Sequence, residues 1–522
     1  MIIQNQFLFC VLALAGGFLA TIHAAEPIRD SFDRSSFPAD FVFGAGSNAF
    51  SAEGAAAVDG KTPSIWDTFT KNYPERIHDQ STPNDSVDFY HRYKEDIKLM
   101  KLIGLDSFRF SISWPRLLPK GKISGGVNPL GVKFYNDLID ELIANDIKPF
   151  VTLFHWDLPQ VLEDEYGGFL SSEIVNDFRD YVDLCFKTFG DRVKHWVTMP
   201  EPNSIAIGGY VIGNYAPGRC SKAFGNCTAG NSATEPYVVA HNLLLSHASA
   251  VKLYKEEYQA KQKGQIGITI VTQWFMPKTD SAADKEAASR MLDFLFGWFA
   301  HPITYGDYPE IMRNLVGDRL PKFSEAESKL VKGSYDFLGI NYYSPQYAEA
   351  PLTSMNTDAA IPQNYLSDTR VTLSTHKDDI PIGTPTSLPW IFTNPKALKE
   401  FVLYIKDKYN NPPIYVTENG VADANNPSLS LEEIRKDELR IKTYEEHLLS
   451  LVEAMKEGGN VKGYYAWSFF DNYEWDAGFT VRFGMVYVDY NNNFQRHLKD
   501  SAYWYKNFLA PKPTPPAFFD EL

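Results

Sequence analysis

The sequence Y-V-T-E-N-G at residues 415–420 delivers a carboxylate to the end of a short extended run. The residues before Glu418 mostly favour β-structure, and Asn419-Gly420 after it is a pair that commonly stops a strand. A carboxylate in this position lies at the rim of a sheet.

A second stretch, H-W-V-T-M-P-E-P-N at residues 195–203, has the same design. β-Branched and aromatic residues come first, and Glu201 then stands between Pro200 and Pro202. Two glutamates that end strands far apart in the sequence indicate a built site.

Eight strand-like runs recur along the chain, and helical periodicity follows most of them, as in Phe89, Tyr93, Ile97 and Met100. The runs are 41–46, 107–112, 149–155, 195–198, 266–271, 337–342, 414–417 and 464–468. Because no linker interrupts this alternation, the sequence predicts an α/β fold, a single (β/α)8 TIM barrel. Long gaps, above all 350–390, are then elongated active-site loops.

Composition narrows the range of partners. The 522 residues include 44% apolar and 14% aromatic side chains, enough for a large core, and the 29 Tyr and 10 Trp indicate stacking surfaces. Lys and Arg number 50 against 65 Asp and Glu, a net charge of −15, which disfavours nucleic acid and anionic membranes. A small molecule is the expected partner, and the sequence permits a homo-oligomer.

The sequences of the two chain ends predict a targeting signal at the amino end and a flexible tail at the carboxyl end. Residues 1–25 read as a secretory signal peptide, with an apolar run at 7–20 and small residues at the cleavage point. Residues 26–510 form the predicted catalytic domain, and 511–522 a flexible Pro-rich tail. The tail ends in F-D-E-L, close to the K-D-E-L retention signal, so the expected location is the secretory pathway: extracellular, vacuolar or the ER lumen.

The cysteines and sequons fit that location. Cys220 and Cys227 flank a short loop, and an oxidising compartment favours a disulfide between them. Cys185 lies in a helical pattern and is expected to be an inert core residue. Asn84 and Asn226 begin glycosylation sequons. No clustered Cys or His pattern predicts a metal, and no cofactor is expected.

In such a barrel the chemistry gathers at the carboxyl ends of the strands. The residues that end or follow the runs are unusually polar and aromatic: Glu53, Arg109, His155, Trp156, Glu201, Asn203, Asn341, Tyr343, Glu418, Trp467, Glu474 and Trp475. Two carboxylates among hydrogen-bonding groups and indole faces suit a sugar ring. A retaining glycosidase places its two carboxyl groups about 5–5.5 Å apart, one as nucleophile and one as acid/base.

Several segments then carry a resemblance to a known family: F-V-F-G-A-G, P-S-I-W-D-T-F, H-R-Y-K-E-D-I-K-L-M, R-F-S-I-S-W-P-R, F-H-W-D-L-P, G-I-N-Y-Y-S, Y-V-T-E-N-G and A-W-S-F-F-D-N-Y-E-W. From about residue 37 to 509 the chain resembles plant β-glucosidases of glycoside hydrolase family 1. The resemblance implies a (β/α)8 barrel with Glu418 as nucleophile and Glu201 as acid/base.

The resemblance also implies the roles of the surrounding residues. Arg109 and Tyr343 hold Glu418, and Trp390 in the long loop matches the aglycone platform. The residues implied to face the sugar are His155, Asn341, Trp467, Glu474 and Trp475. Each also has a structural alternative: a core histidine, a paired arginine, or aromatic rings buried in the core.

Two positions depart from the pattern of the family. The family usually has Asn before the acid/base, where it bonds the sugar 2-hydroxyl, and this chain has Pro200. Proline has neither a side-chain donor nor an N–H. Ser51 stands where the family normally presents a Gln that reads the far hydroxyls. Since contacts at the 2-hydroxyl supply several kcal/mol in the transition state, losing one is expected to cost about a hundredfold in rate.

The sequence therefore predicts a retaining β-glycosidase that hydrolyses small plant glycosides through a covalent glycosyl-enzyme. Three alternatives stay open. One is a transglucosidase, which would share both carboxylates; another is a barrel repurposed for a non-sugar metabolite, favoured by the two missing contacts. The third is a binding or scaffold protein, which the retained carboxylates, Arg109 and Tyr343 disfavour.

Overall fold

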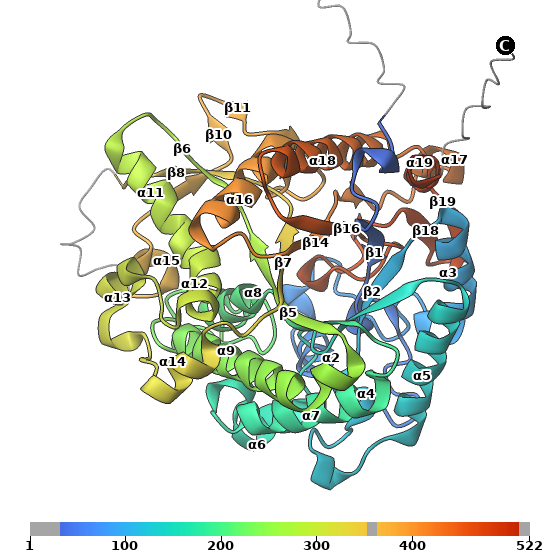
Figure 1. Cartoon of the computed structure of the whole chain (residues 1–522), viewed down its shortest axis with the longest axis horizontal. Helices are drawn as coiled ribbons and strands as arrows, with labels where there is room; N and C mark the ends of the chain where they lie inside the picture. Colours follow the sequence, from blue (N-terminus) through green and yellow to red (C-terminus); the bar gives the residue numbers. More distant parts are fainter. Residues whose placement is uncertain (1–31, 352–362, 511–522) are drawn as a thin grey trace, which may run out of the picture.

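Eight parallel strands close into a barrel at the centre of the molecule (Figure 1). The computed structural model describes residues 32–351 and 363–510. The barrel strands are β1 (Val42–Gly46), β2 (Ser107–Ser111), β3 (Lys148–Thr152), β4 (His195–Pro200), β5 (Gln265–Thr272), β7 (Phe337–Tyr342), β14 (Ile414–Asn419) and β16 (Val461–Trp467). They pair in the order β1-β16-β14-β7-β5-β4-β3-β2. All eight predicted strands and the predicted TIM barrel are confirmed.

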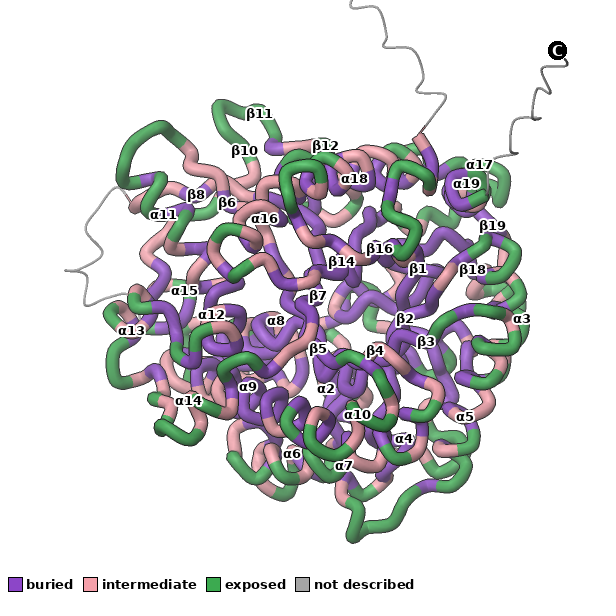
Figure 2. Tube along the Cα trace, viewed as in Figure 1, coloured by how far each residue is buried: buried purple, intermediate pink, exposed green. Residues whose placement is uncertain are grey.

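Most residues of the strands are buried, and this includes polar residues such as Arg109 in β2 and Glu418 in β14. Every residue of β2, β7 and β14 is buried. Parallel strands need crossover connections, and helices supply them on the outside of the sheet. Figure 2 shows the resulting layers, with buried strands around the centre and exposed backbone concentrated on the outer helices and loops.

The helical patterns form the outer layer, and the helix expected from Phe89 to Met100 is α3. The longer helices are α2 (Ile65–Asn72), α3 (Phe89–Ile103), α5 (Pro129–Ala144), α7 (Ile174–Phe189), α9 (Glu235–Leu253), α11 (Ala282–Leu292), α12 (Trp298–Tyr305), α16 (Pro395–Lys408), α18 (Glu438–Lys456) and α19 (Asp500–Leu509). Ile97 and Met100 are fully buried, as their spacing on one helix face predicts.

The two ends of the barrel differ in chemistry. Near the amino ends of the strands, Phe150, Val197, Phe337, Tyr415 and Tyr465 pack into one aromatic and aliphatic cluster. This cluster fills the barrel interior at that end. The polar residues expected to line a site lie at or beyond the opposite ends of the strands, where the long loops begin.

Short strands lie within these loops. Several of them fall in or next to residues 350–390, the segment predicted to be a long active-site loop. The small sheets are β6 (Phe275–Pro277) with β8 (Gln346–Glu349) and β9 (Thr372–Ser374), β10 (His376–Lys377) with β11 (Ile380–Pro381), β12 (Thr384–Pro385) with β13 (Phe392–Thr393), β15 (Asp423–Ala424) with β17 (Val481–Arg482), and β18 (Val486–Asp489) with β19 (Gln495–Leu498). Residues 352–362 of the long gap lie outside the described residues.

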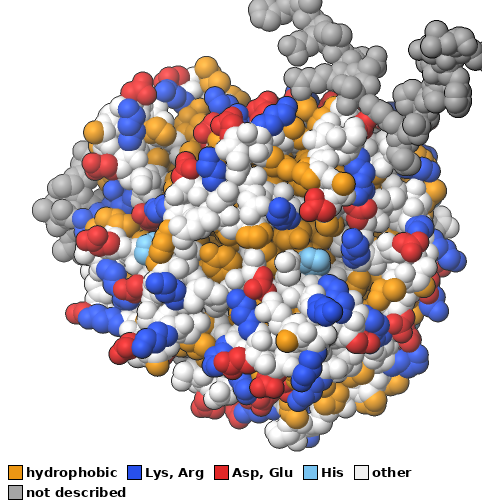
Figure 3. Space-filling view, viewed as in Figure 1, with side chains coloured by type: hydrophobic (Ala, Val, Ile, Leu, Met, Phe, Trp, Pro, Cys, Tyr) orange, Lys and Arg blue, Asp and Glu red, His pale blue; other side chains and the backbone are white. Residues whose placement is uncertain are grey.

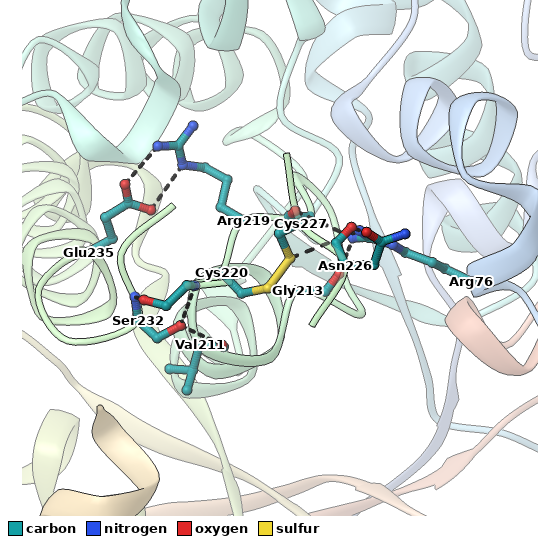
Figure 4. Close-up of a disulfide and its surroundings, with 11 residues drawn as sticks. Arg76, Val211, Gly213, Arg219, Cys220, Asn226, Cys227, Ser232 and Glu235 are labelled. Carbon is teal, nitrogen blue, oxygen red and sulfur yellow. Dashed lines mark hydrogen bonds and ion pairs between the residues drawn. A yellow bond between two sulfur atoms is a disulfide. The ribbon is translucent and has the colours of Figure 1, made fainter. Parts of the chain in front are cut away.

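The predicted disulfide is present. Cys220 and Cys227 are bonded, with 5.5 Å between their Cα atoms. Figure 4 shows Arg76 reaching this loop, where its guanidinium donates to the carbonyls of Gly213 and Asn226 at 2.5 and 2.7 Å. The disulfide and Arg76 together tie down a loop that follows β4. Elsewhere, Cys185 is free and buried as expected, and burial raises the pKa of its thiol.

The predicted signal peptide at residues 1–25 and the predicted tail at 511–522 lie outside the described residues. Within residues 32–351 and 363–510, no helix combines the length and apolar character needed to cross a bilayer. On the face shown in Figure 3, acidic and basic side chains are interspersed.

Candidate active site

Glu418 at the end of β14 is held by two donors of different kinds. Arg109 Nη1 from β2 donates to Oε1 at 2.6 Å, and the Tyr343 hydroxyl donates to Oε2 at 2.7 Å. Arg109 is fully buried and Glu418 is 4% exposed, so the guanidinium faces the carboxylate with little water between them. This ion pair stabilises the negative charge of the carboxylate, as the sequence led us to expect for a nucleophile.

Glu201 beyond the end of β4 meets only neutral donors. Asn341 Nδ2 donates to Oε1 at 2.7 Å, and Ser204 Oγ donates to Oε2 at 2.8 Å. Burial and then the negative charge of Glu418 raise the pKa of Glu201 to about 7, although both hydrogen bonds lower it. A carboxyl group with a pKa near neutrality can both give and take a proton.

Strand β7 connects the two carboxylates. Asn341 in β7 contacts Glu201, and Tyr343, the first residue after this strand, contacts Glu418. Thr417 fixes the amide of Asn341, because its hydroxyl donates to Asn341 Oδ1 at 2.8 Å. Side chains of one strand and its extension therefore hold the two glutamates, and the charge of Glu418 acts on Glu201.

The backbone around Glu201 is unusual. Glu201 has φ 49° and ψ 52° in the left-handed region, and its N–H donates to the carbonyl of Thr269 at 2.8 Å. Trp156 and Trp475 also have positive φ values, of 72° and 49°. Such conformations cost about 1–3 kcal/mol each and persist where the surroundings dictate them, typically at functional sites.

Aromatic rings form one wall of the site. The ring of His155 stacks on Trp475 with 5.7 Å between centroids, and Trp156 lies 4.2 Å from Trp475. His155 lies 6.3 Å from Trp467 on its other side. Burial and the charge of Arg109 lower the pKa of His155, so the imidazole is neutral. Its Nδ1 is buried and has no hydrogen-bond partner among the described residues, as expected for an atom that awaits a ligand hydroxyl.

Glu474 completes this wall. Trp467 Nε1 donates to Glu474 Oε1 at 3.3 Å. Burial and then the charge of Glu418 raise the pKa of Glu474 well above its ordinary value. The site thus holds three buried carboxyl groups and indole faces, which is the mixture that a polyhydroxylated ring requires.

Trp390 lies at the edge of the cluster. It is 43% exposed, and its ring meets the ring of Tyr343 edge-on at 6.0 Å. The structure therefore brings this loop residue beside the tyrosine that binds Glu418. An exposed indole at the rim is suited to stack on a second, apolar part of a ligand.

Glu53 and Asn203, which the sequence grouped with the strand ends, bind other partners: Glu53 follows α1 and Asn203 lies in α8. Both carboxylate oxygens of Glu53 are engaged by Arg116 Nε at 2.9 Å and the Tyr135 hydroxyl at 2.6 Å. Asn203 Nδ2 donates to the carbonyls of Val271 and Leu295. These contacts give Glu53 and Asn203 structural roles.

Pro200 and Ser51, the two positions predicted to depart from the family pattern, are both buried. The carbonyl of Pro200 accepts a hydrogen bond from Trp156 Nε1 at 3.1 Å. Ser51 is fully buried in α1 (Ala49–Ala52), where its Oγ accepts from Asn48 Nδ2 at 3.0 Å. Asn48 caps this helix through Ser51 N at 2.8 Å. The Ser51 hydroxyl therefore serves the helix cap.

Two residues of the site were not predicted from the sequence: Ser204, which binds Glu201, and Thr417, which orients Asn341. Ser204 stands three residues after Glu201 in α8 (Pro202–Ile207), and this spacing brings side chains together at a helix start. That spacing was a usable signal. Among the described residues, no three His, Cys, Asp or Glu side chains gather as a metal site.

Comparison with known proteins identifies the family. Residues 33–513 match Glycosyl hydrolase family 1. The chain is 54% identical over 514 residues to Beta-glucosidase 17 of Arabidopsis thaliana, covering 98% of each chain. It is 52% identical over 500 residues to the isoflavonoid 7-O-beta-apiosyl-glucoside beta-glycosidase of Dalbergia nigrescens, covering 96% of this chain and 89% of that one.

A solved structure agrees. A mutant rice β-glucosidase in a covalent complex with glucose from GA4GE superimposes with a TM-score of 0.90 at 46% identity. The match covers 92% of this chain and 100% of the rice chain. The predicted resemblance is confirmed: the chain belongs to glycosyl hydrolase family 1 and is a glycosidase of the β-glucosidase type.

Proposed function

We propose that Glu418 is the nucleophile and Glu201 the acid/base of a retaining β-glycosidase. One observation carries the assignment: Glu418 pairs with a buried guanidinium, whereas Glu201 has only neutral donors. A nucleophile must stay ionised, and an acid/base must change its protonation state during each turnover. The difference in partners matches this division of labour.

In the first step, an oxygen of Glu418 attacks the anomeric carbon while the bond to the aglycone oxygen breaks. Glu201 donates its proton to that oxygen, and the pKa of about 7 produced by burial and the charge of Glu418 lets it hold a proton near neutral pH. The products are the free aglycone and a glycosyl ester on Glu418.

In the second step, water attacks the anomeric carbon and the ester bond to Glu418 breaks. Glu201, now ionised, takes the proton of the water and is restored. Two inversions at one carbon give net retention. The structural relative with covalently bound glucose supports a covalent route in this fold.

The sugar-binding roles follow from the polar and aromatic wall. We assign sugar hydroxyl contacts to His155, Asn341 and Glu474, and ring contacts to Trp467 and Trp475. Stacked and hydrogen-bonded side chains of these types suit the C–H faces and hydroxyls of a pyranose. Trp390, half exposed beside Tyr343, is assigned to the aglycone.

The substrate class is small plant glycosides. Relatives named for such substrates support it, among them the apiosyl-glucoside β-glycosidase and the raucaffricine-O-beta-D-glucosidase of Rauvolfia serpentina. Their names favour hydrolysis over the transglucosidase and non-sugar alternatives. Pro200 and Ser51 leave glucose recognition weaker than the family pattern, because neither supplies the amide expected at its position.

The secretory location remains a proposal of its own. The Cys220–Cys227 disulfide and the exposed Asn84 and Asn226 side chains support it. Expression of the full chain in plant cells tests it: treatment with peptide N-glycosidase should increase gel mobility, and Asn84→Gln with Asn226→Gln should abolish the change. A mobility unaffected by the glycosidase in the parent chain contradicts glycosylation.

Stereochemistry tests the proposed reaction. Proton NMR of aryl β-glucoside hydrolysis should show β-glucose as the first sugar formed, before mutarotation. First appearance of α-glucose would show inversion and would overturn the assignment of Glu418 as a nucleophile.

A further inference from the structure

The two oxygens of Glu201 are not equivalent. Oε1 faces Asn341 Nδ2 and Oε2 faces Ser204 Oγ. Thr417 Oγ1 donates to the other end of the Asn341 amide, at Oδ1, so the NH2 group of Asn341 points at Glu201. An NH2 group donates and never accepts. Oε1 is therefore an acceptor in both protonation states, and the proton of Glu201 belongs on Oε2.

Ser204 is the side chain bound to that proton-carrying oxygen. A hydroxyl both donates and accepts. It can donate to Oε2 when Glu201 is ionised, and it can rotate its hydrogen away when Oε2 carries a proton. Asn341 lacks this freedom, so of these two donors only Ser204 can pair with the oxygen that gains and loses the proton.

Ser204 and Glu201 are also coupled through the backbone. Glu201 is the residue before α8, in a left-handed conformation between two prolines, and Ser204 lies in the first turn of that helix. The two prolines restrict the backbone on either side of Glu201. The two residues thus lie on one turn, which holds Oε2 of Glu201 beside the Ser204 hydroxyl. Ser204 is only partly buried, whereas Glu201 is 8% exposed.

We propose that Ser204 is a positioning residue that keeps Oε2 of Glu201 aligned with the leaving-group oxygen in the first step and with water in the second. The proposal rests on the acid/base assignment of Glu201. In the first step the Oε2–H bond breaks as the proton joins the departing oxygen. In the second step a water proton restores that bond, and Ser204 keeps its own proton throughout.

Removing the hydroxyl has a defined electrostatic effect. Burial and the charge of Glu418 raise the pKa of Glu201, and donation from Ser204 lowers it. Ser204→Ala deletes that donation, so the basic limb of the pH–rate profile moves to higher pH. The loss of one hydrogen bond to a carboxylate corresponds to a shift of about half to one pH unit.

The test compares Ser204→Ala with Ser204→Thr, using aryl β-glucosides whose phenols differ in leaving ability. For Ser204→Ala we expect an upward shift of the basic limb. We also expect kcat/KM, which reports the glycosylation step, to fall about 3- to 10-fold with phenyl glucoside and little with 2,4-dinitrophenyl glucoside, because only the poor leaving group needs the proton. Ser204→Thr keeps a hydroxyl and should restore both properties.

The control is Ser344→Ala, which deletes a buried hydroxyl next to Tyr343 in the sequence; the Oγ of Ser344 contacts the backbone of Pro345 and Phe392. Its basic limb should coincide with that of the parent enzyme. An unshifted basic limb in Ser204→Ala overturns the proposal, as does an equal loss with every leaving group or a failure of Ser204→Thr to restore the profile.

Glu201→Gln, assayed in parallel, separates this inference from the proposed function. If Glu201→Gln loses activity selectively with poor leaving groups while Ser204→Ala resembles the parent enzyme, the role of Ser204 is refuted and the acid/base assignment stands. If Glu201→Gln hydrolyses phenyl glucoside as fast as the parent enzyme, the acid/base assignment itself fails, and the Ser204 proposal falls with it.

Discussion

Glu418 and Glu201 are the same kind of residue at the ends of two strands in one barrel, but their surroundings differ. Glu418 is bound by a buried guanidinium and a phenol. Glu201 is bound by an amide and an aliphatic hydroxyl, on a left-handed turn between two prolines. The charge of Arg109 stabilises one carboxylate, and nothing of comparable strength contacts the other.

This difference shows that position on the barrel does not fix the role of a glutamate. The side chains that approach each carboxylate decide it, because opposite charge favours the ionised form and burial opposes it. The negative charge of Glu418 then acts on Glu201: burial is the largest cause of the raised pKa of Glu201, and the charge of Glu418 is the second largest. The charge of the proposed nucleophile thus helps to give Glu201 the pKa that its proposed role as an acid requires.

The largest expected effect is at Glu418. Glu418→Gln keeps the size of the side chain and removes the attacking oxygen anion, so kcat on aryl glucosides should fall by at least about 10⁴-fold. Steady-state kinetics measure the loss, with circular dichroism to confirm folding. A folded variant that retains a tenth of the parent kcat would contradict the account.

The second effect is at Glu201, and it depends on the substrate. Glu201→Gln should lose about 10²- to 10⁴-fold with phenyl glucoside and much less in the glycosylation of 2,4-dinitrophenyl glucoside, which needs no proton to leave. Glu201→Ala with added azide should form β-glucosyl azide, because the anion attacks the anomeric carbon in place of water and needs no base. If Glu201→Gln and Glu418→Gln lose the same activity with both substrates, the proposed difference in role between the two glutamates is wrong.

A third effect is a gain, at the residue before Glu201. Pro200→Asn restores the amide expected at this position and keeps the carbonyl that accepts from Trp156. We expect kcat/KM for aryl glucosides to rise by up to about a hundredfold.

Ser51→Gln serves as the comparison variant for Pro200→Asn. It should give a smaller gain, because the Ser51 hydroxyl accepts from Asn48 in a filled helix cap. If neither variant changes kcat/KM, the two positions do not limit glucose recognition.

The smallest effect concerns stability. Burial and then the charge of Glu418 raise the pKa of Glu201 to about 7, compared with about 4.3 in the unfolded chain. The native state therefore loses stability as pH rises from about 4.3 to about 7, because in this range Glu201 ionises readily in the unfolded chain and stays protonated in the native state. Glu201→Gln removes this loss, so Tm of the variant relative to the parent should rise by about 3 °C between pH 5 and pH 8.

An exposed glutamate provides the control for that measurement. The side chain of Glu325 is 84% exposed, so Glu325→Gln should give a difference in Tm that varies little with pH. A difference for Glu201→Gln that falls as pH rises would contradict the raised pKa of Glu201.

The fold was predictable because the barrel strands are runs of 5–8 residues rich in β-branched and aromatic side chains, with helical periodicity between most of them. The short strand pairs outside the barrel were not, since strands such as β10 and β15 have only 2 residues and carry no period. The sequence also grouped Glu53 with the site because it follows a strand. Arg116 and Tyr135, distant in sequence, engage both of its oxygens.

The candidate site was predictable in its residue types and less so in its partners. The resemblance implied that Arg109 and Tyr343 hold Glu418, and the structure has both contacts. Ser204 escaped notice because a serine near a helix start is commonly a cap or a solvent-facing residue. Its spacing of three residues from Glu201 was the signal that could have found it.

The central claim is that Glu418 forms the covalent bond to the sugar while Glu201 moves the proton. The most direct test is to incubate the enzyme with 2-deoxy-2-fluoro-β-glucosyl fluoride, digest it, and sequence the modified peptide by mass spectrometry. The account predicts one glycosyl adduct, on Glu418, in the peptide that contains Y-V-T-E-N-G. An adduct on Glu201, or turnover of aryl glucosides that this reagent neither slows nor labels, would contradict it.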